Sequence, residues 1–514
     1  MHNKEIKIGA ILSYIFIVIN NIIGLIYTPI MLKYMGQSEY GLYSLAAAII
    51  GYLTILDLGF GNAIIVYTSK YLANGKKEEL KNLHGMFKIL YTFIGIVSLV
   101  IGIILYFNIE KIFLNSMTAY EISRAKIIML ILTFNLAITF SMSIYGSIII
   151  AYEKFIFSKI LSIVRQVLNP IIMLPLLFMG YRAIAMTVVL TILNVSCLIA
   201  NKIYCEKKLK LNIKTTKWDK TLLKEIFGYS FFIFLCTIAD KANWSIDQVI
   251  LGSISGTIVV AIYSLATQVN SIYLSFSNAI TGVLIPKVTK MIESNATDKE
   301  VSEIFIKNGR IQYMILALIL SGFIIFGREF ILLWAGTEYN TSYIIACLLI
   351  ASATITIIQD LGVAVLQAKK LVRFRSLTYI ILAIFNVLVS IPLSKKMGGI
   401  GAALGTAITL FIRDTIIMNI YYYKKAKLDI PRFWKNILSI SIPILFIAII
   451  GYIINYYVYN LSWMFLFVKI CIYTLLYFIV TFKLSLNNYE KDLLIKGPLN
   501  KVKKIFRVFI KSNK

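Results

Sequence analysis

Residues 36–46 read GQSEYGLYSLA and residues 256–266 read GTIVVAIYSLA, so a glycine and a Tyr-Ser-Leu-Ala motif recur 220 positions apart. Further along the chain, residues 169–175 (NPIIMLP) are matched by residues 386–392 (NVLVSIP) at an offset of 217. One chance match of four letters would mean little in so apolar a chain. Because several markers recur in the same order at nearly one offset, the sequence predicts two copies of one structural unit.

The composition places these copies in a membrane. Of the 514 residues, 59% are hydrophobic and 15% are charged, and the mean hydropathy is +0.81. A soluble domain has about 45–50% apolar and about 25% charged residues, and a single core cannot hide this excess. One bilayer crossing takes roughly 20 apolar residues, so we predict an all-α polytopic membrane protein with about 14 transmembrane helices. The predicted spans lie near residues 8–32, 41–67, 84–107, 125–151, 156–179, 181–203, 226–252, 258–285, 307–334, 342–367, 376–394, 400–422, 436–458 and 463–482.

The repeat divides these spans into two pseudo-symmetric six-helix lobes followed by two appended helices. Six is an even number, so both lobes cross the membrane in the same direction and are related by an axis along the membrane normal. The predicted organisation is an N-terminal lobe at 1–205, a cytoplasmic linker at 206–225, a C-terminal lobe at 226–425, helices 13 and 14 at 426–485, and a basic amphipathic cytoplasmic tail at 486–514.

The distribution of charge predicts the orientation. The chain carries 52 Lys and Arg against 24 Asp and Glu, a formal net charge of +28. Most of the basic residues fall in alternate loops and in the tail, so the positive-inside rule places both termini in the cytoplasm. The opposite loops hold few, namely Lys33, Lys111, Arg124, Lys126, Arg182, Lys395 and Lys396. This placement argues against nucleic acid as a partner. We expect the protein in the cytoplasmic (inner) membrane of a bacterium.

Few residues suit metal or redox chemistry. The five cysteines are scattered without a CxxC pair, and the only histidines are His2 and His84. Neither a disulfide framework nor a zinc site is supported, and we expect no metal and no cofactor.

Several motifs carry a resemblance to a known family. Residues 57–71 (DLGFGNAIIVYTSKY) and 75–80 (GKKEEL) resemble the second-helix signature of polysaccharide-biosynthesis transporters. These are the Wzx-type lipid-linked oligosaccharide flippases of the multidrug/oligosaccharidyl-lipid/polysaccharide exporter superfamily. Residues 247–252 (DQVILG), followed by 261–266, and residues 333–339 (LWAGTEY) are similar to later helices of that family.

The resemblance implies a function as well as a fold. It implies two six-helix lobes around a central cavity that opens alternately to the two membrane faces. The implied substrate is a polyprenyl-diphosphate-linked glycan, moved from the inner to the outer leaflet for surface polysaccharides such as O-antigen or capsule. Membrane lipids, a glycan polymerase and chain-length proteins are the expected partners. Translocation makes and breaks no covalent bond, so we do not expect this protein to be an enzyme.

A polar stripe in span 7 is the first candidate for the cavity wall. It is formed at helical positions i, i+3, i+4 and i+7 by Asp240, Asn243, Trp244 and Asp247. A charge in mid-membrane costs at least ~2.5–3.5 kcal/mol, so it usually faces a cavity or a partner. For Asp240 and the neighbouring Lys241 the alternative is simple solvation near the inner membrane interface.

Other polar residues extend this site. The 220 offset pairs Asp240 with Asn20 and Lys241 with Asn21 in span 1. Arg165 in span 5 has polar neighbours at helical spacing and suits a diphosphate, because a guanidinium can hold two oxygens at once. The predicted substrate-binding residues are Asn20, Asn21, Arg165, Asp240, Lys241, Asn243, Trp244, Asp247, Gln248 and Arg310.

Some ionisable residues within spans have more than one interpretation. Four are expected either to couple an ion or to pair structurally, namely Asp57, Asp360, Arg413 and Asp414. Snorkelling into the headgroups is the alternative for Arg310 and the expected behaviour of Lys469 in span 14.

The sequence also bears on two other functional classes, a membrane-embedded enzyme and a cation exporter. A membrane-embedded glycan polymerase or glycosyltransferase needs catalytic acidic or histidine residues on a sizeable outer loop. In the longest predicted outer loop, 108–124, the only acidic residues are Glu110 and Glu121, and there is no histidine. A multidrug or cation exporter of the sister family would have twelve helices and an acidic cavity, whereas this chain has two extra helices and mixed charge. Cation export remains the alternative to lipid-linked oligosaccharide translocation.

Overall fold

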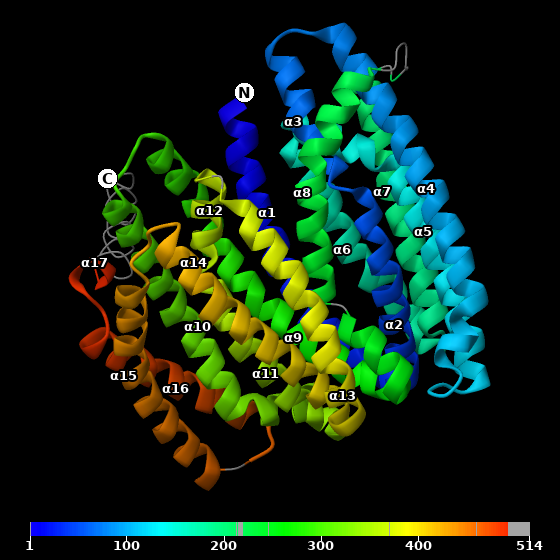
Figure 1. Cartoon of the computed structure of the whole chain (residues 1–514). Helices are drawn as coiled ribbons and strands as arrows, with labels where there is room; N and C mark the ends of the chain where they lie inside the picture. The colour runs from blue at the N-terminus through cyan, green and yellow to red at the C-terminus, as the bar shows by residue number, and fades with distance from the viewer. Residues whose placement is uncertain are drawn as a thin grey trace, which may run out of the picture. The chain divides into compact units, whose positions relative to one another are not determined.

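The computed structural model describes residues 2–211, 213, 219–244, 246–369, 371–458 and 460–491. Among these residues all regular structure is helical and no strand occurs, which confirms the predicted all-α fold class (Figure 1). The predicted tail falls largely on residues 492–514, and part of the predicted linker falls on 212 and 214–218, all outside the described residues.

The first half of the chain forms α1 (His2–Met35), α2 (Gln37–Leu53), η1 (Thr54–Asp57), α3 (Phe60–Ala73), α4 (Lys77–Phe113), α5 (Ala119–Ala151), α6 (Phe155–Phe178), α7 (Ala183–Lys207) and α8 (Lys220–Trp244). The second half forms α9 (Ile246–Glu293), α10 (Asp298–Ala335), η2 (Thr337–Tyr339), α11 (Asn340–Ile357), α12 (Asp360–Ala368), α13 (Val372–Phe411), η3 (Ile412–Ile417), α14 (Met418–Lys424), α15 (Ile430–Tyr457), α16 (Trp463–Leu484) and α17 (Asn488–Lys491).

Within the described residues, twelve segments are long and apolar enough to cross a membrane, which confirms a polytopic protein. The segment Arg373–Lys424 has 52 residues, far more than a ~30 Å hydrocarbon core requires at 1.5 Å per residue. Gly398 interrupts it with non-helical backbone angles (φ 55°, ψ −133°). The segment is therefore long enough for the two predicted spans 376–394 and 400–422. In the first half of the chain, the predicted span 226–252 is divided between α8 and α9.

The sequence repeat is also a repeat of backbone conformation. Gly36, between α1 and α2, has φ 80° and ψ 166°, and Gly256, at the kink in α9, has φ 81° and ψ −175°. Residues with a Cβ are strongly disfavoured in this region, which explains glycine at both turns. Gly180 and Gly398, at an offset of 218, also both have positive φ, of 88° and 55°.

Residue contacts group the chain into two compact units. Unit 1 comprises Met1–Gln268 and Arg373–Thr409. In unit 1, α4 packs along α5, α5 along α7, and α1 along α6 (Figure 1). Small residues permit these close approaches, since a Cβ on Gly102 of α4 would lie only 2.1 Å from Cγ2 of Thr133 on α5.

The two copies of the repeat meet inside unit 1. A Cβ on Gly41 of α2 would lie 1.9 Å from the backbone oxygen of Thr257 in α9, so the two backbones touch at this glycine. Nearby, Gln268 of α9 donates a hydrogen bond of 2.6 Å from Nε2 to Oγ1 of Thr28 in α1. The repeated glycine stretch therefore serves as a packing surface as well as a turn.

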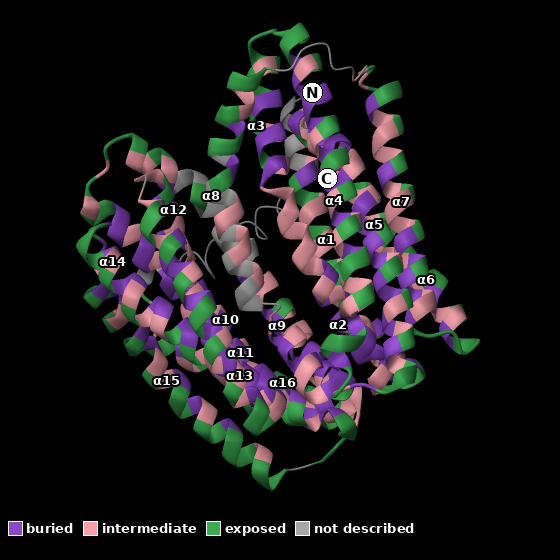
Figure 2. Ribbon diagram, turned by 45° about the vertical axis from the view of Figure 1, so that its right-hand side comes forward, coloured by how far each residue is buried: buried purple, intermediate pink, exposed green. Residues whose placement is uncertain are grey.

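Unit 2 comprises Val269–Val372 and Leu410–Lys514, and in it α10 packs against α11, α15 and α16. An ion pair joins the appended helices to α10, because Nζ of Lys469 lies 2.9 Å from both carboxylate oxygens of Glu329 and 2.8 Å from Oδ1 of Asn455. Lys469 is only 7% exposed, so the expectation that it snorkels is wrong. Many apolar side chains of α15 and α16 remain exposed, as a lipid-facing surface requires (Figure 2).

Candidate functional site

The predicted polar stripe is divided between two helices, because Asp240, Asn243 and Trp244 belong to the end of α8 and Asp247 belongs to the start of α9. The side chains of Asp240, Asn243 and Trp244 lie outside the described residues, so their place in a cavity stays a prediction.

The side chains of Lys241 and Gln248, next to the stripe in sequence, are among the described residues, and both are half-buried in unit 1. Nζ of Lys241 lies 4.0 Å from the position that a Cβ on Gly51 would take, and its backbone carbonyl accepts a 3.2 Å hydrogen bond from the Tyr52 hydroxyl. Gln248 donates from Nε2 to Oγ of Ser264 at 3.1 Å. These contacts place Lys241 against the end of α2 and Gln248 against the second part of α9.

Asp247, near the start of α9, lies in a closed polar cluster and is only 2% exposed. Its Oδ2 accepts hydrogen bonds of 2.6 Å from the hydroxyls of Tyr263 and Thr406. Asn386 and Ser390 of α13 extend the cluster, since Ser390 donates to Oδ1 of Asn386 at 3.0 Å and Asn386 donates to Thr406 at 3.3 Å. Oδ1 of Asp247 is buried and has no hydrogen-bond partner in the part of the chain that the structure describes.

This cluster suits a small cation better than a glycan. A buried carboxylate with an unpaired oxygen is costly unless its charge is neutralised. The carboxylate can take a proton on Oδ1, or it can hold a monovalent cation together with the neighbouring hydroxyl and amide oxygens. A cluster of three or more His, Cys, Asp or Glu side chains of the kind that binds transition metals does not occur among the described residues.

Sequence reasoning did not assign the partners of Asp247 to the site. Tyr263 and Asn386 were marked only as members of the repeated motifs, and Thr406 was not marked at all. A usable signal was present in the polar residues of an apolar segment, because Asn386, Ser390 and Thr406 all fall within predicted spans.

Arg165 has a different environment, because it lies in the middle of α6 and is exposed. Its Nη1 donates to Oδ1 of Asn194 on α7 at 2.9 Å. Asn194 in turn donates to Asn135 at 2.8 Å and to Thr139 at 2.7 Å, both on α5. No carboxylate pairs with Arg165 among the residues described. The guanidinium is therefore held by a neutral group within a membrane-spanning helix, without a described carboxylate to balance its charge.

Asn20 and Asn21 lie on α1, which packs along α6 in unit 1. Asn20 is exposed and Asn21 is half-buried. The structure thus brings Asn20, Asn21 and Arg165 onto neighbouring helices of one compact unit. Their contact with a substrate stays a prediction.

Arg310 belongs to unit 2 and is 6% exposed. Its Nε and Nη2 bind the two carboxylate oxygens of Glu490 at 2.6 and 2.9 Å, and its Nη1 donates to Oδ1 of Asn436 at 3.0 Å. The burial of this bidentate pair contradicts snorkelling. Because its donors are already engaged by α15 and α17, Arg310 stabilises the attachment of these helices and is left out of the proposed substrate site.

Asp57 lies at a break in the second predicted span and is half-buried. Leu58 and Gly59 have φ of 52° and 76°, which ends η1 and starts α3 afresh. The carboxylate accepts a 2.7 Å hydrogen bond from the Tyr91 hydroxyl, and its Oδ2 lies 3.5 Å from the backbone nitrogen of Gly61. A carboxylate at the start of a helix is stabilised by the helix dipole, so the position is suited to capping α3.

The adjacent residues Arg413 and Asp414 form a buried pair in η3, a π-helical turn of unit 2. Their side chains approach to 2.8 Å, and Oδ2 of Asp414 also accepts a 2.5 Å hydrogen bond from the Thr356 hydroxyl. These contacts favour the structural interpretation. Asp360 begins α12 and is half-buried, and ion coupling at this residue stays a prediction.

Comparison with known proteins assigns the family. The family described as "Polysaccharide biosynthesis protein" matches residues 7–292, which is more than half of the chain. A curated relative, the probable low-salt glycan biosynthesis flippase Agl15 of Haloferax volcanii, is 24% identical over 198 residues. That match covers 38% of this chain and 41% of the relative, less than half the length of either.

Solved structures show the same fold. A lipid II flippase MurJ in an inward closed conformation has a TM-score of 0.72 at 18% identity, and the likeness covers 92% of this chain and 98% of that one. An inward-facing multidrug resistance MATE family transporter of the MOP superfamily has a TM-score of 0.58 at 14% identity, over 81% of this chain and 99% of that one. The chain therefore has the fold of these transporters, and by its family match it belongs to the polysaccharide biosynthesis proteins.

Proposed function

We propose that the chain flips a polyprenyl-diphosphate-linked oligosaccharide from the inner to the outer leaflet of the cytoplasmic membrane by alternating access, for surface polysaccharide biosynthesis. The family match and the names of the relatives, a glycan biosynthesis flippase and a lipid II flippase, support this proposal. The observation that carries it is Arg165, an exposed guanidinium in a membrane-spanning helix that no described carboxylate pairs with.

The proposed substrate explains why such a group is needed. A diphosphate carries about two negative charges, and the attached sugars carry hydroxyl groups that hydrocarbon dissolves poorly. A guanidinium can bind two phosphate oxygens in a fixed fork, and Arg165 is held in position by Asn194. Lys241 supplies a second cation, and the amides of Asn20 and Asn21 are suited to sugar hydroxyls. The polyprenyl tail stays in the bilayer during the transfer.

The membrane potential can drive this transfer. With both termini in the cytoplasm and the inside negative, moving two negative charges outward gains about 4.6 kcal/mol per 100 mV, at ~2.3 kcal/mol per charge. A proton or monovalent cation moving inward through the Asp247 cluster would add to that free energy. No step forms or breaks a covalent bond, so the proposed activity is transport and not enzymatic catalysis.

Substitution of Arg165 tests the proposal. In cells that need this protein for surface glycan, Arg165→Ala should abolish export while the amount of membrane-inserted protein stays normal. Arg165→Lys should restore export in part, because the charge returns without the bidentate geometry.

The matched control is Lys126→Ala, which removes one positive charge from an ion pair with Glu110 at a helix end of the same unit. This variant should export normally. Normal export by Arg165→Ala would contradict a role for this guanidinium in binding the diphosphate.

Cation export is the alternative, because MATE transporters have the same fold. An exporter of cationic drugs gains nothing from an exposed guanidinium in its pathway, since like charges repel. Extrusion of a cationic dye with no effect on lipid-linked glycan would favour the alternative over the proposal.

A further inference from the structure

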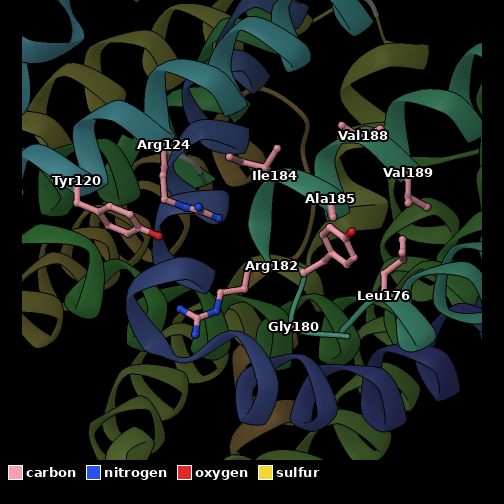
Figure 3. A pocket seen from close by; sticks show the side chains of 10 residues that line it. Tyr120, Arg124, Leu176, Gly180, Arg182, Ile184, Ala185, Val188 and Val189 are labelled. Carbon is pink, nitrogen blue, oxygen red and sulfur yellow. The ribbon is translucent and has the colours of Figure 1, made fainter. Parts of the chain in front are cut away.

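A pocket of about 710 Å³ lies in unit 1 where α5 and α7 begin and α6 ends. It includes none of the residues in the proposed transport site. Its lining has two parts, a polar part with Tyr120, Arg124, Tyr181 and Arg182, and an apolar part with Leu176, Ile184, Ala185, Val188 and Val189. Figure 3 shows the guanidinium groups of Arg124 and Arg182 on the same side as the phenol of Tyr120, with Leu176, Val188 and Val189 on the other side.

Arg124 is a fixed part of this pocket. Its Nε and Nη2 lie 2.5 and 3.1 Å from the two carboxylate oxygens of Glu39, a residue of α2 that is 5% exposed. Glu39 also accepts a 3.3 Å hydrogen bond from the backbone nitrogen of Ala183, at the start of α7. The guanidinium lies 5.4 Å from the ring centre of Tyr120, close enough for a cation–π contact. Three helices thus hold Arg124 in place.

Arg182 supplies positive charge that is not compensated. Gly180 makes the turn after α6 with φ 88°, and Arg182 follows as the residue before α7. The side chain of Arg182 is exposed, and no hydrogen bond or ion pair engages it within the described residues. Because Glu39 balances Arg124, the polar end of the pocket keeps a net charge of about +1 and attracts an anion.

The apolar part continues along the lipid-facing side of α7. Val188 is 38% exposed and Ile192, one helical turn further on, is 58% exposed. Both lie in the membrane-spanning segment Ala183–Lys207. A ligand that fills this pocket therefore meets cationic groups at one end and hydrocarbon-like side chains at the other.

We propose that this pocket binds an anionic phospholipid of the surrounding bilayer, with its phosphate at Arg182 and Arg124 and one acyl chain along α7. The ends of membrane-spanning helices lie at the level of the lipid headgroups, where tyrosines such as Tyr120 and Tyr181 also gather. A guanidinium can hold two oxygens of a phosphate group at once in a fixed fork, which suits a phospholipid headgroup. A free phosphate would satisfy the cations but would leave the apolar wall unfilled.

The test measures how much phosphatidylglycerol the purified full-length protein keeps. The protein is extracted from vesicles of phosphatidylcholine and phosphatidylglycerol in equal amounts, and the retained lipids are counted by native mass spectrometry. Wild type should retain phosphatidylglycerol in preference to phosphatidylcholine. Arg182→Ala should reduce this retention about tenfold, as expected for the loss of a charge-assisted hydrogen bond, and Arg182→Lys should recover part of it.

Two further variants separate the parts of the pocket. Val188→Trp fills the apolar wall without changing the charge and should also lower retention. Lys396→Ala removes an exposed lysine outside the pocket in the same unit and should not. None of these residues belongs to the proposed transport site, so failure of this test leaves the flippase proposal standing.

Three results would overturn the assignment. Equal retention of the two phospholipids by wild type would show that charge does not select the ligand. Unchanged retention in both Arg182→Ala and Val188→Trp would place any bound lipid elsewhere. Full displacement of phosphatidylglycerol by inorganic phosphate, or by a polyprenyl phosphate present as a minor component, would assign the pocket to a free anion or to the transported lipid.

Discussion

Asp247 and Arg165 are both charged residues of membrane-spanning helices, yet their surroundings suit different tasks. The carboxylate of Asp247 is buried and accepts hydrogen bonds from Tyr263 and Thr406, an enclosed polar setting that suits a proton or a small cation. Arg165 is exposed and is held by the neutral side chain of Asn194. We therefore separate the two, with Asp247 as the candidate for ion coupling and Arg165 as the candidate for the diphosphate.

Two substitutions of Asp247 should distinguish the role of its charge in transport from the role of its hydrogen bonds in stability. In Asp247→Asn the amide oxygen can still accept from Tyr263 and Thr406, so the protein should fold but lose any stimulation of transport by a proton or sodium gradient. In Asp247→Ala both hydroxyls lose their acceptor, at about 1–3 kcal/mol each, and the thermal unfolding midpoint should fall. Transport is measured in vesicles with imposed gradients. Wild-type gradient dependence in Asp247→Asn would show that the carboxylate is only structural.

The sequence predicted single residues better than it predicted their partners. Asp247 stood out because a carboxylate in an apolar span is unusual, but Thr406 is 159 residues away and only folding brings it near. Lys469 was expected to snorkel because nothing near it in the sequence indicated a partner. Its buried partner, Glu329, is 140 residues away along the chain. Hydropathy predicts which residues are in the membrane, and it contains no information on which polar groups meet there.

At the scale of helices, the sequence predicted most spans well. Span 125–151 corresponds to α5 (Ala119–Ala151), and span 463–482 corresponds to α16 (Trp463–Leu484). Where the ends differ, local caps are the reason. α5 begins six residues early because Thr118 and Glu121 form a capping box beyond the apolar stretch. The sequence did not predict the kink at Gly256 directly. It showed only that this glycine repeats Gly36.

The two repeated glycines provide a matched pair of substitutions. Gly36 and Gly256 have nearly the same backbone angles, so alanine at either site carries a conformational cost of about 1–3 kcal/mol. A Cβ at Gly36 meets no atom of the described residues within 4 Å, whereas one at Gly256 would lie 2.6 Å from the backbone oxygen of Ser116. Gly256→Ala should therefore lower the thermal unfolding midpoint in detergent more than Gly36→Ala. Equal midpoints would contradict the close packing of α9 against the loop after α4.

At the scale of the whole molecule, the sequence predicted an all-helical membrane protein of this family, and the described residues and the family match agree with it. The lobe boundaries stay a prediction. Compact unit 1 contains residues from both copies of the repeat, because Gly41 and Thr257 join α2 to α9. A repeat in sequence shows which segments are alike, but the contacts that form on folding decide which of them share a compact unit.

The central claim is that this chain moves a lipid-linked oligosaccharide across a membrane, and transfer in sealed vesicles tests it most directly. Purified protein is reconstituted with a polyprenyl-diphosphate-linked oligosaccharide, and a glycosidase added outside reports how much glycan reaches the outer leaflet. The protein should speed this transfer over protein-free vesicles. An inside-negative potential should speed it further, because it supplies about 4.6 kcal/mol per 100 mV to a doubly charged headgroup. Transfer no faster than in protein-free vesicles, under an imposed potential and an imposed cation gradient alike, would contradict the claim.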